Sequence, residues 1–94
     1  MIIHGIGKPE GCKLIRVDAE IENEVILKMA IRGDFFAVPE EAFEGIEKRI
    51  APVPLDELAR KFDALLIEDG IQVFGIHGQA LFEIIQGALN VTRV

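Results

Sequence analysis

The sequence has one cysteine, no tryptophan and no tyrosine, and it contains no long run of apolar residues. A single cysteine cannot form an internal disulfide, and it offers no cluster with the ligand spacing of a zinc site. A transmembrane helix needs roughly 20 consecutive apolar residues, and no stretch of this chain approaches that length. The sequence therefore excludes a disulfide-stabilised scaffold and predicts no contact with a membrane.

Positive charge is also scarce. Ten lysine and arginine residues stand against sixteen aspartate and glutamate residues, which gives a formal net charge of −6. Binding to nucleic acid needs a basic patch that neutralises phosphates, whereas the basic residues here are scattered along the chain. We therefore expect no nucleic-acid partner. Residues 1–5 do not resemble a signal peptide, and we expect a cytoplasmic protein.

Half of the 94 residues are hydrophobic, which is enough for one modest core, so we expect residues 1–94 to form a single domain. Regular alternation over residues 13–22 predicts a strand with one buried face. A second strand is expected over residues 25–32. The apolar residues in phase are Ile15, Val17, Ala19 and Ile21 in the first strand, and Val25, Leu27, Met29 and Ile31 in the second.

These two strands form a predicted antiparallel hairpin. A three-residue connection over residues 22–24 keeps both apolar faces on one side, because a slip of one residue would turn one face to solvent. That register pairs Ile21 with Val25 and places Asp18 opposite Lys28. The turn chemistry favours glycine or asparagine at the last connecting position, which is a glutamate here, and a bulge is the alternative that reconciles the two.

Three amphipathic helices are expected after the hairpin. They cover residues 39–50, 54–69 and 78–89, with Pro39 and Pro54 at the first helical positions and Gly70 as a C-cap. Residues 71–76 fit either a short strand or an extended connection, and residues 91–94 are expected as a tail. The predicted fold is of the α+β class, a small antiparallel sheet built on the N-terminal hairpin and covered on one face by about three helices.

No catalytic, cofactor-binding or metal-binding set emerges from the remaining residues. His4 and His77 are far apart in the chain and flanked by glycine, so they are expected in solvent or in loops. The glutamates at 40, 41, 44 and 47 are expected on a solvated helix face. Residues 1–11 are expected as an arm or a short edge strand, and residues 5–8, which lack the Walker spacing, as a flexible lead-in. Cys12 is expected as a small buried residue, because a reactive thiol needs an electropositive setting.

The segment Gly33-Asp34-Phe35-Phe36 is the candidate partner interface. Gly33 is free to take a positive φ, and the Asp34 carboxylate can accept hydrogen bonds from the turn that follows. At most one of two adjacent phenylalanines is expected to point into the core, which leaves the other near the surface. Phe36 is favoured as the inward ring, because Gly33 turns the chain before Phe35.

The order of these segments resembles the C-terminal accessory domain of lipoate–protein ligases. The resemblance spans about residues 11–89, and it is most specific where a strand is followed by Gly33-Asp34-Phe35-Phe36 and a helix opened by Pro39-Glu40-Glu41-Ala42. The other matching segments are Lys13-Leu14-Ile15-Arg16-Val17, residues 26–31, Leu55-Asp56-Glu57-Leu58 and residues 80–89. The sequence departs from the family at Glu24, where the hairpin turn of the family often has glycine.

The resemblance implies the small subunit of a bipartite lipoate–protein ligase, with no catalytic site of its own. It would be required, with a large catalytic subunit, for the ATP-dependent activation of lipoate to lipoyl-adenylate. ATP, magnesium and lipoate are expected on the large subunit, which passes lipoate to a lysine of lipoyl-acceptor proteins. One alternative is a sulfur carrier or scaffold of iron–sulfur assembly, which needs Cys12 exposed beside Lys8 or Lys13. A self-associating structural domain, using the hairpin edge, is a third possibility.

Overall fold

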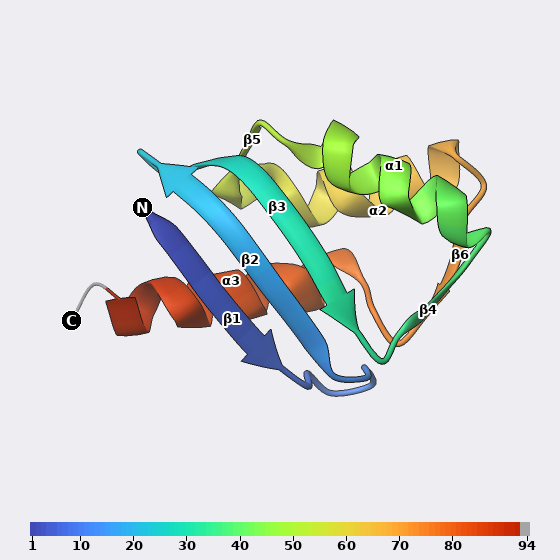
Figure 1. Cartoon of the computed structure of the whole chain (residues 1–94), viewed down its shortest axis with the longest axis horizontal. Coiled ribbons are helices and arrows are strands. Elements are labelled where there is room, and N and C mark those ends of the chain that lie inside the picture. The colour runs from blue at the N-terminus through green and yellow to red at the C-terminus, as the bar shows by residue number, and fades with distance from the viewer. Residues whose placement is uncertain (93–94) are drawn as a thin grey trace.

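The computed structural model describes residues 1–92 and contains two antiparallel sheets and three α-helices (Figure 1). The larger sheet has the strand order β1 (Ile2–Gly7), β2 (Ile15–Glu22), β3 (Val25–Gly33) and β5 (Val53–Pro54), and the smaller one joins β4 (Phe36–Val38) to β6 (Gln72–Phe74). The helices are α1 (Glu40–Ile50), α2 (Leu58–Glu68), which follows the 3-10 turn η1 (Leu55–Glu57), and α3 (Gly78–Thr92). The predicted α+β class is confirmed.

The core lies between the larger sheet and the helices. Alternate residues of β2 point into it, and α3 packs on β1 and β2 while α1 packs on β3 and α2. Strong apolar periodicity explains why the predictions for these elements hold, since each element can bury only one face. The buried helical residues include Phe43, Ile46 and Ile50 of α1, Leu58, Phe62, Leu65 and Leu66 of α2, and Leu81, Ile85 and Leu89 of α3.

The hairpin between β2 and β3 has a two-residue turn, so the predicted three-residue connection is wrong. Asn23 and Glu24 have positive φ angles of 51° and 64°, as the two central residues of a type I′ turn do. Ile21 consequently pairs with Ile26. The right-handed twist of the strands favours this turn, although the left-handed conformation is strained for a glutamate.

A bulge next to the turn returns the apolar residues of β3 to the buried face, but the pairing stays two residues away from the predicted register, so that Asp18 pairs with Ala30 and not with Lys28. Glu20 pairs with Lys28, which leaves Leu27 as the extra residue in β3. Ile26 is buried, Leu27 is exposed and Val25 is only half-buried, contrary to the predicted phase, whereas Met29 and Ile31 beyond the bulge are buried as predicted.

Both prolines expected at first helical positions lie one step outside their helices. Pro39 has the extended angles φ −75° and ψ 143° and precedes α1, and Pro54 ends β5 before η1. The predicted end of α2 is confirmed, because Gly70 follows it with a φ of 65°. Helix α3 continues to Thr92, so the prediction of a tail is wrong for residues 91 and 92, and residues 93–94 lie outside the described part of the chain.

The N-terminal residues form β1, an edge strand, and the interpretation of residues 5–8 as a flexible lead-in is wrong for the part that lies in the strand. Two glycines in β1 let α3 approach closely. A Cβ atom on Gly5 would lie 2.8 Å from Cγ2 of Ile84, and one on Gly7 would lie 3.1 Å from Cγ1 of the same residue. Side chains at these positions would push the helix away from the sheet.

Candidate interaction site

Gly33 fixes the place where the chain leaves the larger sheet. Its φ is 153°, and a Cβ atom at this position would lie only 2.1 Å from the carbonyl oxygen of Leu14. The backbone N–H of Asp34 donates to that same carbonyl oxygen at 2.9 Å. The predicted positive φ of Gly33 is therefore confirmed. Within residues 1–92 the exposed Asp34 carboxylate makes no hydrogen bond to the turn, contrary to the sequence prediction.

The two phenylalanines point in opposite directions, and the prediction that Phe36 is the inward ring is wrong. Phe35 is half-buried, and its ring lies 5.3 Å from that of Phe43, which in turn meets Phe62 edge-on at 6.2 Å. The Phe36 side chain is 67% exposed. The reason is that Phe35, just after the bend at Asp34, lies against the core, whereas Phe36 begins β4 on its outer face.

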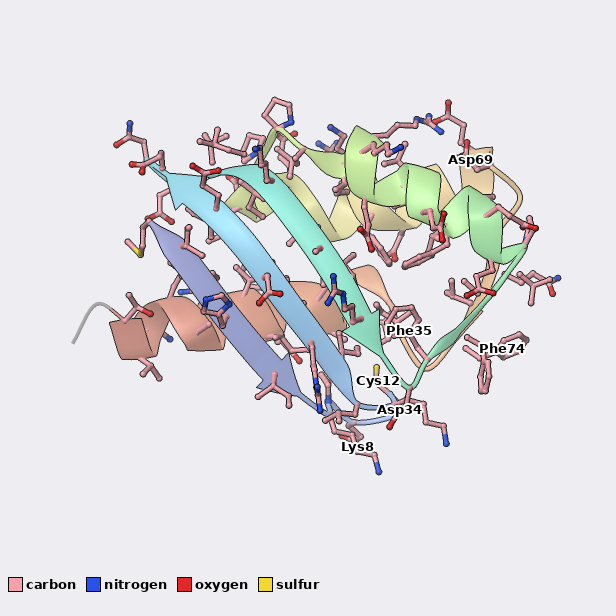
Figure 2. The ribbon with its side chains drawn as sticks, viewed as in Figure 1. Lys8, Cys12, Asp34, Phe35, Asp69 and Phe74 are labelled. Carbon is pink, nitrogen blue, oxygen red and sulfur yellow. The ribbon has the colours of Figure 1, made fainter. Side chains whose placement is uncertain are left out.

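Strand β4 forms a two-stranded ribbon with β6, in which Phe36 stands directly opposite Phe74. Residues two apart on a strand share a face, so Val38 lies on the same side as this aromatic pair. Val38 is 58% exposed and Phe74 is 60% exposed, and Figure 2 shows Phe74 pointing away from the body of the protein. Phe36, Val38 and Phe74 together form the apolar ribbon face.

The opposite face of this ribbon packs on the protein core. Ala37 and Val73 are half-buried and pack against the core, so they anchor the strands that carry the apolar ribbon face. Single exposed apolar residues are normal, but a contiguous group of them is typical of an interaction site. Sequence reasoning missed Val38 and Phe74, and its only signal for the latter was the ambiguous strand pattern over residues 71–76.

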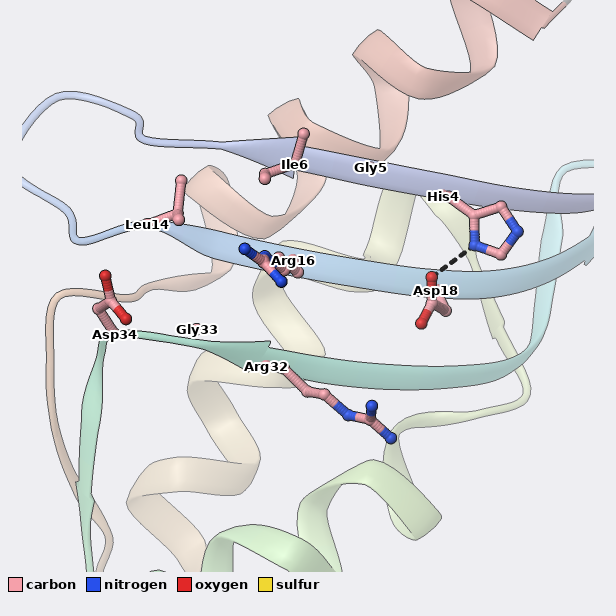
Figure 3. A pocket seen from close by; sticks show the side chains of 9 residues that line it. All are labelled: His4, Gly5, Ile6, Leu14, Arg16, Asp18, Arg32, Gly33 and Asp34. Atoms are coloured by element: carbon pink, nitrogen blue, oxygen red, sulfur yellow. Dashed lines mark hydrogen bonds and ion pairs between the residues drawn. The ribbon is translucent and has the colours of Figure 1, made fainter.

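A hollow on the open face of the larger sheet is lined by several charged side chains and one histidine (Figure 3). His4 Nδ1 lies 2.5 Å from Oδ1 of Asp18, and both side chains are exposed. Arg16 stands opposite Arg32, but Figure 3 shows the two guanidinium groups pointing apart. The full lining is His4, Gly5, Ile6, Leu14, Arg16, Asp18, Arg32, Gly33 and Asp34. No hydroxyl or thiol lies among these residues, so this lining supplies no nucleophile for the imidazole to activate.

Two other polar residues singled out in the sequence, His77 and Glu47, have structural partners. His77 is exposed, and its Nδ1 accepts a hydrogen bond from the N–H of Ala80 at 3.1 Å at the start of α3. The interpretation of Glu47 as part of a solvated face is wrong, because it is half-buried and accepts the N–H of Ile31 at 3.2 Å. Residues 1–92 contain no group of His, Cys, Asp and Glu that could hold a metal ion, and no helix among them is long and apolar enough to span a membrane.

Cys12 is buried, with 7% of its surface exposed, as predicted. Burial raises the pKa of the Cys12 thiol, and the negative charge of Glu83 raises this pKa further. A raised pKa keeps the thiol protonated at neutral pH and lowers its reactivity. The sulfur-carrier alternative requires an exposed Cys12, and this requirement is not met.

We predict that the native protein reacts slowly with a thiol-specific reagent and that unfolding in guanidinium restores the full rate of reaction.

The raised pKa of Cys12 also predicts a pH effect on the stability of the protein. The contribution of the thiol is complete below the pKa of the unfolded cysteine, about 8.5, and is lost as pH rises through the native pKa, because the unfolded chain ionises first. Denaturant titrations should therefore show a smaller alkaline loss of stability for Cys12→Ala than for the unaltered protein. Fast labelling of the native protein by the thiol-specific reagent would contradict the first of these two predictions, the low reactivity of Cys12.

Comparison with known proteins gives one informative match. No protein-family model matches the chain, and no curated protein matches it. Among solved structures, it is similar to a chain in the structure of an archaeal lipoylation system, a bi-partite lipoate protein ligase and its E2 lipoyl domain from Thermoplasma acidophilum. The TM-score is 0.69 and the sequence identity is 21%, over 95% of this chain and 94% of the other. This likeness shows a shared fold. The two coverages also mean that the chains have nearly equal lengths.

Proposed function

We propose that this chain is the non-catalytic small subunit of a bipartite lipoate–protein ligase. The observation that carries the proposal is the shared fold with a chain of nearly equal length from the Thermoplasma acidophilum lipoylation system. The sequence resemblance supports it at the residues where it is most specific, since the structure has the same order of elements there: Gly33 ends β3, Phe36 begins β4, and α1 starts at Glu40. The burial of Cys12 disfavours the sulfur-carrier alternative.

In this proposal the large subunit binds lipoate, ATP and magnesium and forms lipoyl-adenylate, whereas the small subunit supplies no reacting group. Adenylation requires the lipoate carboxylate and the α-phosphate to be held in line and shielded from water. A docked small subunit favours adenylation if it binds the competent conformation of the large subunit more tightly than the other conformations. The small subunit therefore acts through differential affinity.

The contact with the large subunit is proposed to include Gly33, Asp34, Phe35 and Phe36. Phe36 is the apolar anchor, and Phe74 and Val38 extend it on the apolar ribbon face. Aromatic side chains at the centre of an interface commonly carry much of the binding energy. Phe35 and Gly33 contribute indirectly, by holding this segment in position. The Phe35 ring packs on Phe43, and Gly33 fixes the end of β3.

A reconstitution experiment tests the proposed function. We expect lipoate-dependent exchange of pyrophosphate into ATP only when this chain and a purified large subunit are both present. Cys12→Ser should stimulate the exchange as the unaltered chain does, since a buried cysteine has no role in it. Micromolar binding of ATP to this chain alone would contradict the proposal. Attachment of a lipoyl group to a lysine of this chain would instead make it an acceptor, and intact-mass spectrometry detects that outcome.

A further inference from the structure

Within residues 1–92 no strand lies beside the outer edge of β1. Strand β1 is the terminal strand of the larger sheet, and in this part of the chain it pairs only with β2. The N–H of Ile21 donates to the carbonyl oxygen of Met1 at 2.8 Å. This hydrogen bond shows which residues of β1 direct their backbone N–H and C=O groups toward β2. In an antiparallel pair the direction alternates along the strand, so the N–H and C=O groups of Ile2, His4 and Ile6 point to the open edge. The strand contains no proline, lysine or bulge, which are the features that commonly protect exposed edges.

A groove of about 550 Å³ runs along this edge between β1 and α3. Small residues line both of its sides, Gly5 and Gly7 on the strand and Gly87 and Ala88 on the helix. Ile84 packs against the two strand glycines, whereas a Cβ atom on Gly87 would have no atom within 4 Å, so the groove is open on the Gly87 side. Apolar surface in the groove comes from Ile84 and Val91, charge comes from Lys8 and Glu83, and Ile6 lies at the rim of the groove on the strand. Figure 1 shows α3 passing behind β1, on the helical side of the sheet.

We propose that this groove binds an extended segment of another protein, which adds to the larger sheet as an antiparallel strand beside β1. The open backbone groups of Ile2, His4 and Ile6 bond the segment, and every second side chain of the segment enters the groove. The groove therefore selects apolar residues at alternate positions. An antiparallel segment begins where β1 ends, so an acidic residue at its N-terminal end lies next to Lys8.

A second copy of this chain fits the edge less well. Its own β1 would direct Gly5 and Gly7 toward the helical layer, and residues without side chains cannot fill the groove. A six-residue strand is about 20 Å long and the layers are about 10 Å deep, which gives a contact of about 200 Å² on each partner. Stable dimers bury about 800 Å² on each partner. The edge is therefore suited to a short segment, and this inference does not rest on the proposed function.

The experiment fills the groove without disturbing the fold. Gly87 lines the groove, and a Cβ atom there would have no atom within 4 Å, so Gly87→Leu adds a side chain at the groove without a clash. Gly45→Leu is a matched control, because Gly45 is also helical, also has nothing within 4 Å and belongs to α1, which packs on β3 and α2. Leucine is the better helix former, so both variants should melt no earlier than the unaltered protein.

The probe is a blocked peptide that begins with aspartate and then alternates valine with threonine, titrated into isotope-labelled protein and followed by NMR. We expect the largest amide shifts at Ile2, His4 and Ile6, with slower hydrogen exchange at these amides in the complex. The dissociation constant should rise at least tenfold for Gly87→Leu and stay within twofold for Gly45→Leu. Unchanged affinity of Gly87→Leu, no binding by the unaltered protein, or a dimer that Gly87→Leu dissociates would each overturn the proposal.

Discussion

A protein in which Phe36 and Phe74 are both replaced by alanine is expected to fold normally but to lose most of its stimulation of lipoate adenylation. The two rings are 67% and 60% exposed, so their removal takes little apolar surface from the core. Their cross-strand contact contributes at most about 1 kcal/mol to stability. An aromatic anchor at the centre of an interface contributes about 2 kcal/mol or more to binding, which is about a thirtyfold change in affinity for each ring. Pyrophosphate exchange at increasing subunit concentration measures that change.

Two further variants separate the apolar ribbon face from general effects. Ile67 of α2 is 83% exposed, so Ile67→Ala removes exposed apolar surface away from the ribbon and should leave the exchange unchanged. Phe35→Ala should instead lower the melting temperature, because its ring packs on Phe43. If the double variant stimulates the exchange at the same concentration as the unaltered chain, the contact with the large subunit lies elsewhere on the protein.

The parts of the fold that the sequence predicts are those that a local period determines. Four alternating apolar residues from Ile15 to Ile21 allow only one buried face for β2, and the stripe from Leu58 to Leu66 does the same for α2. Gly70 marks the end of α2 because glycine tolerates the left-handed conformation after a helix. Each of these inferences needs only neighbouring residues.

The missed features depend on contacts between distant parts of the chain. The apolar ribbon face needs Phe36 and Phe74 to be paired across α1 and α2, and no local pattern specifies that pairing. The direction of Phe35 is set by Phe43 on the following helix. The groove beside β1 depends on Gly5 facing Ile84 near the other end of the chain. The bulge at Leu27 arises where the preferred geometry of the turn competes with the burial of both apolar faces.

Gly33→Ala, which adds one methyl group, is expected to be among the glycine-to-alanine substitutions that lower the free energy of unfolding of this protein most. The added Cβ would lie 2.1 Å from the Leu14 carbonyl oxygen and 3.0 Å from the Cα of Ile15, both of which are backbone atoms. The ends of β2 and β3 must separate to relieve this overlap, which breaks the 2.9 Å hydrogen bond from the N–H of Asp34. Backbone strain of about 1–3 kcal/mol and a lost hydrogen bond of about 1 kcal/mol give a loss of about 2–4 kcal/mol.

Gly11→Ala is the control that isolates the overlap from backbone conformation. Gly11 also has a positive φ, 77°, but a Cβ atom there would have nothing within 4 Å. This variant should lose only about 1–2 kcal/mol, the conformational cost of a left-handed residue. For a domain of this size each kcal/mol lowers Tm by about 4–8 °C, so thermal melts distinguish the two variants. Equal melting temperatures would mean that the contact between Gly33 and Leu14 does not hold the strand end. A larger loss of stability for Gly33→Ala should be accompanied by weaker stimulation of the large subunit. The contact between Gly33 and Leu14 determines where the chain leaves β3, and therefore where Phe35 and Phe36 lie.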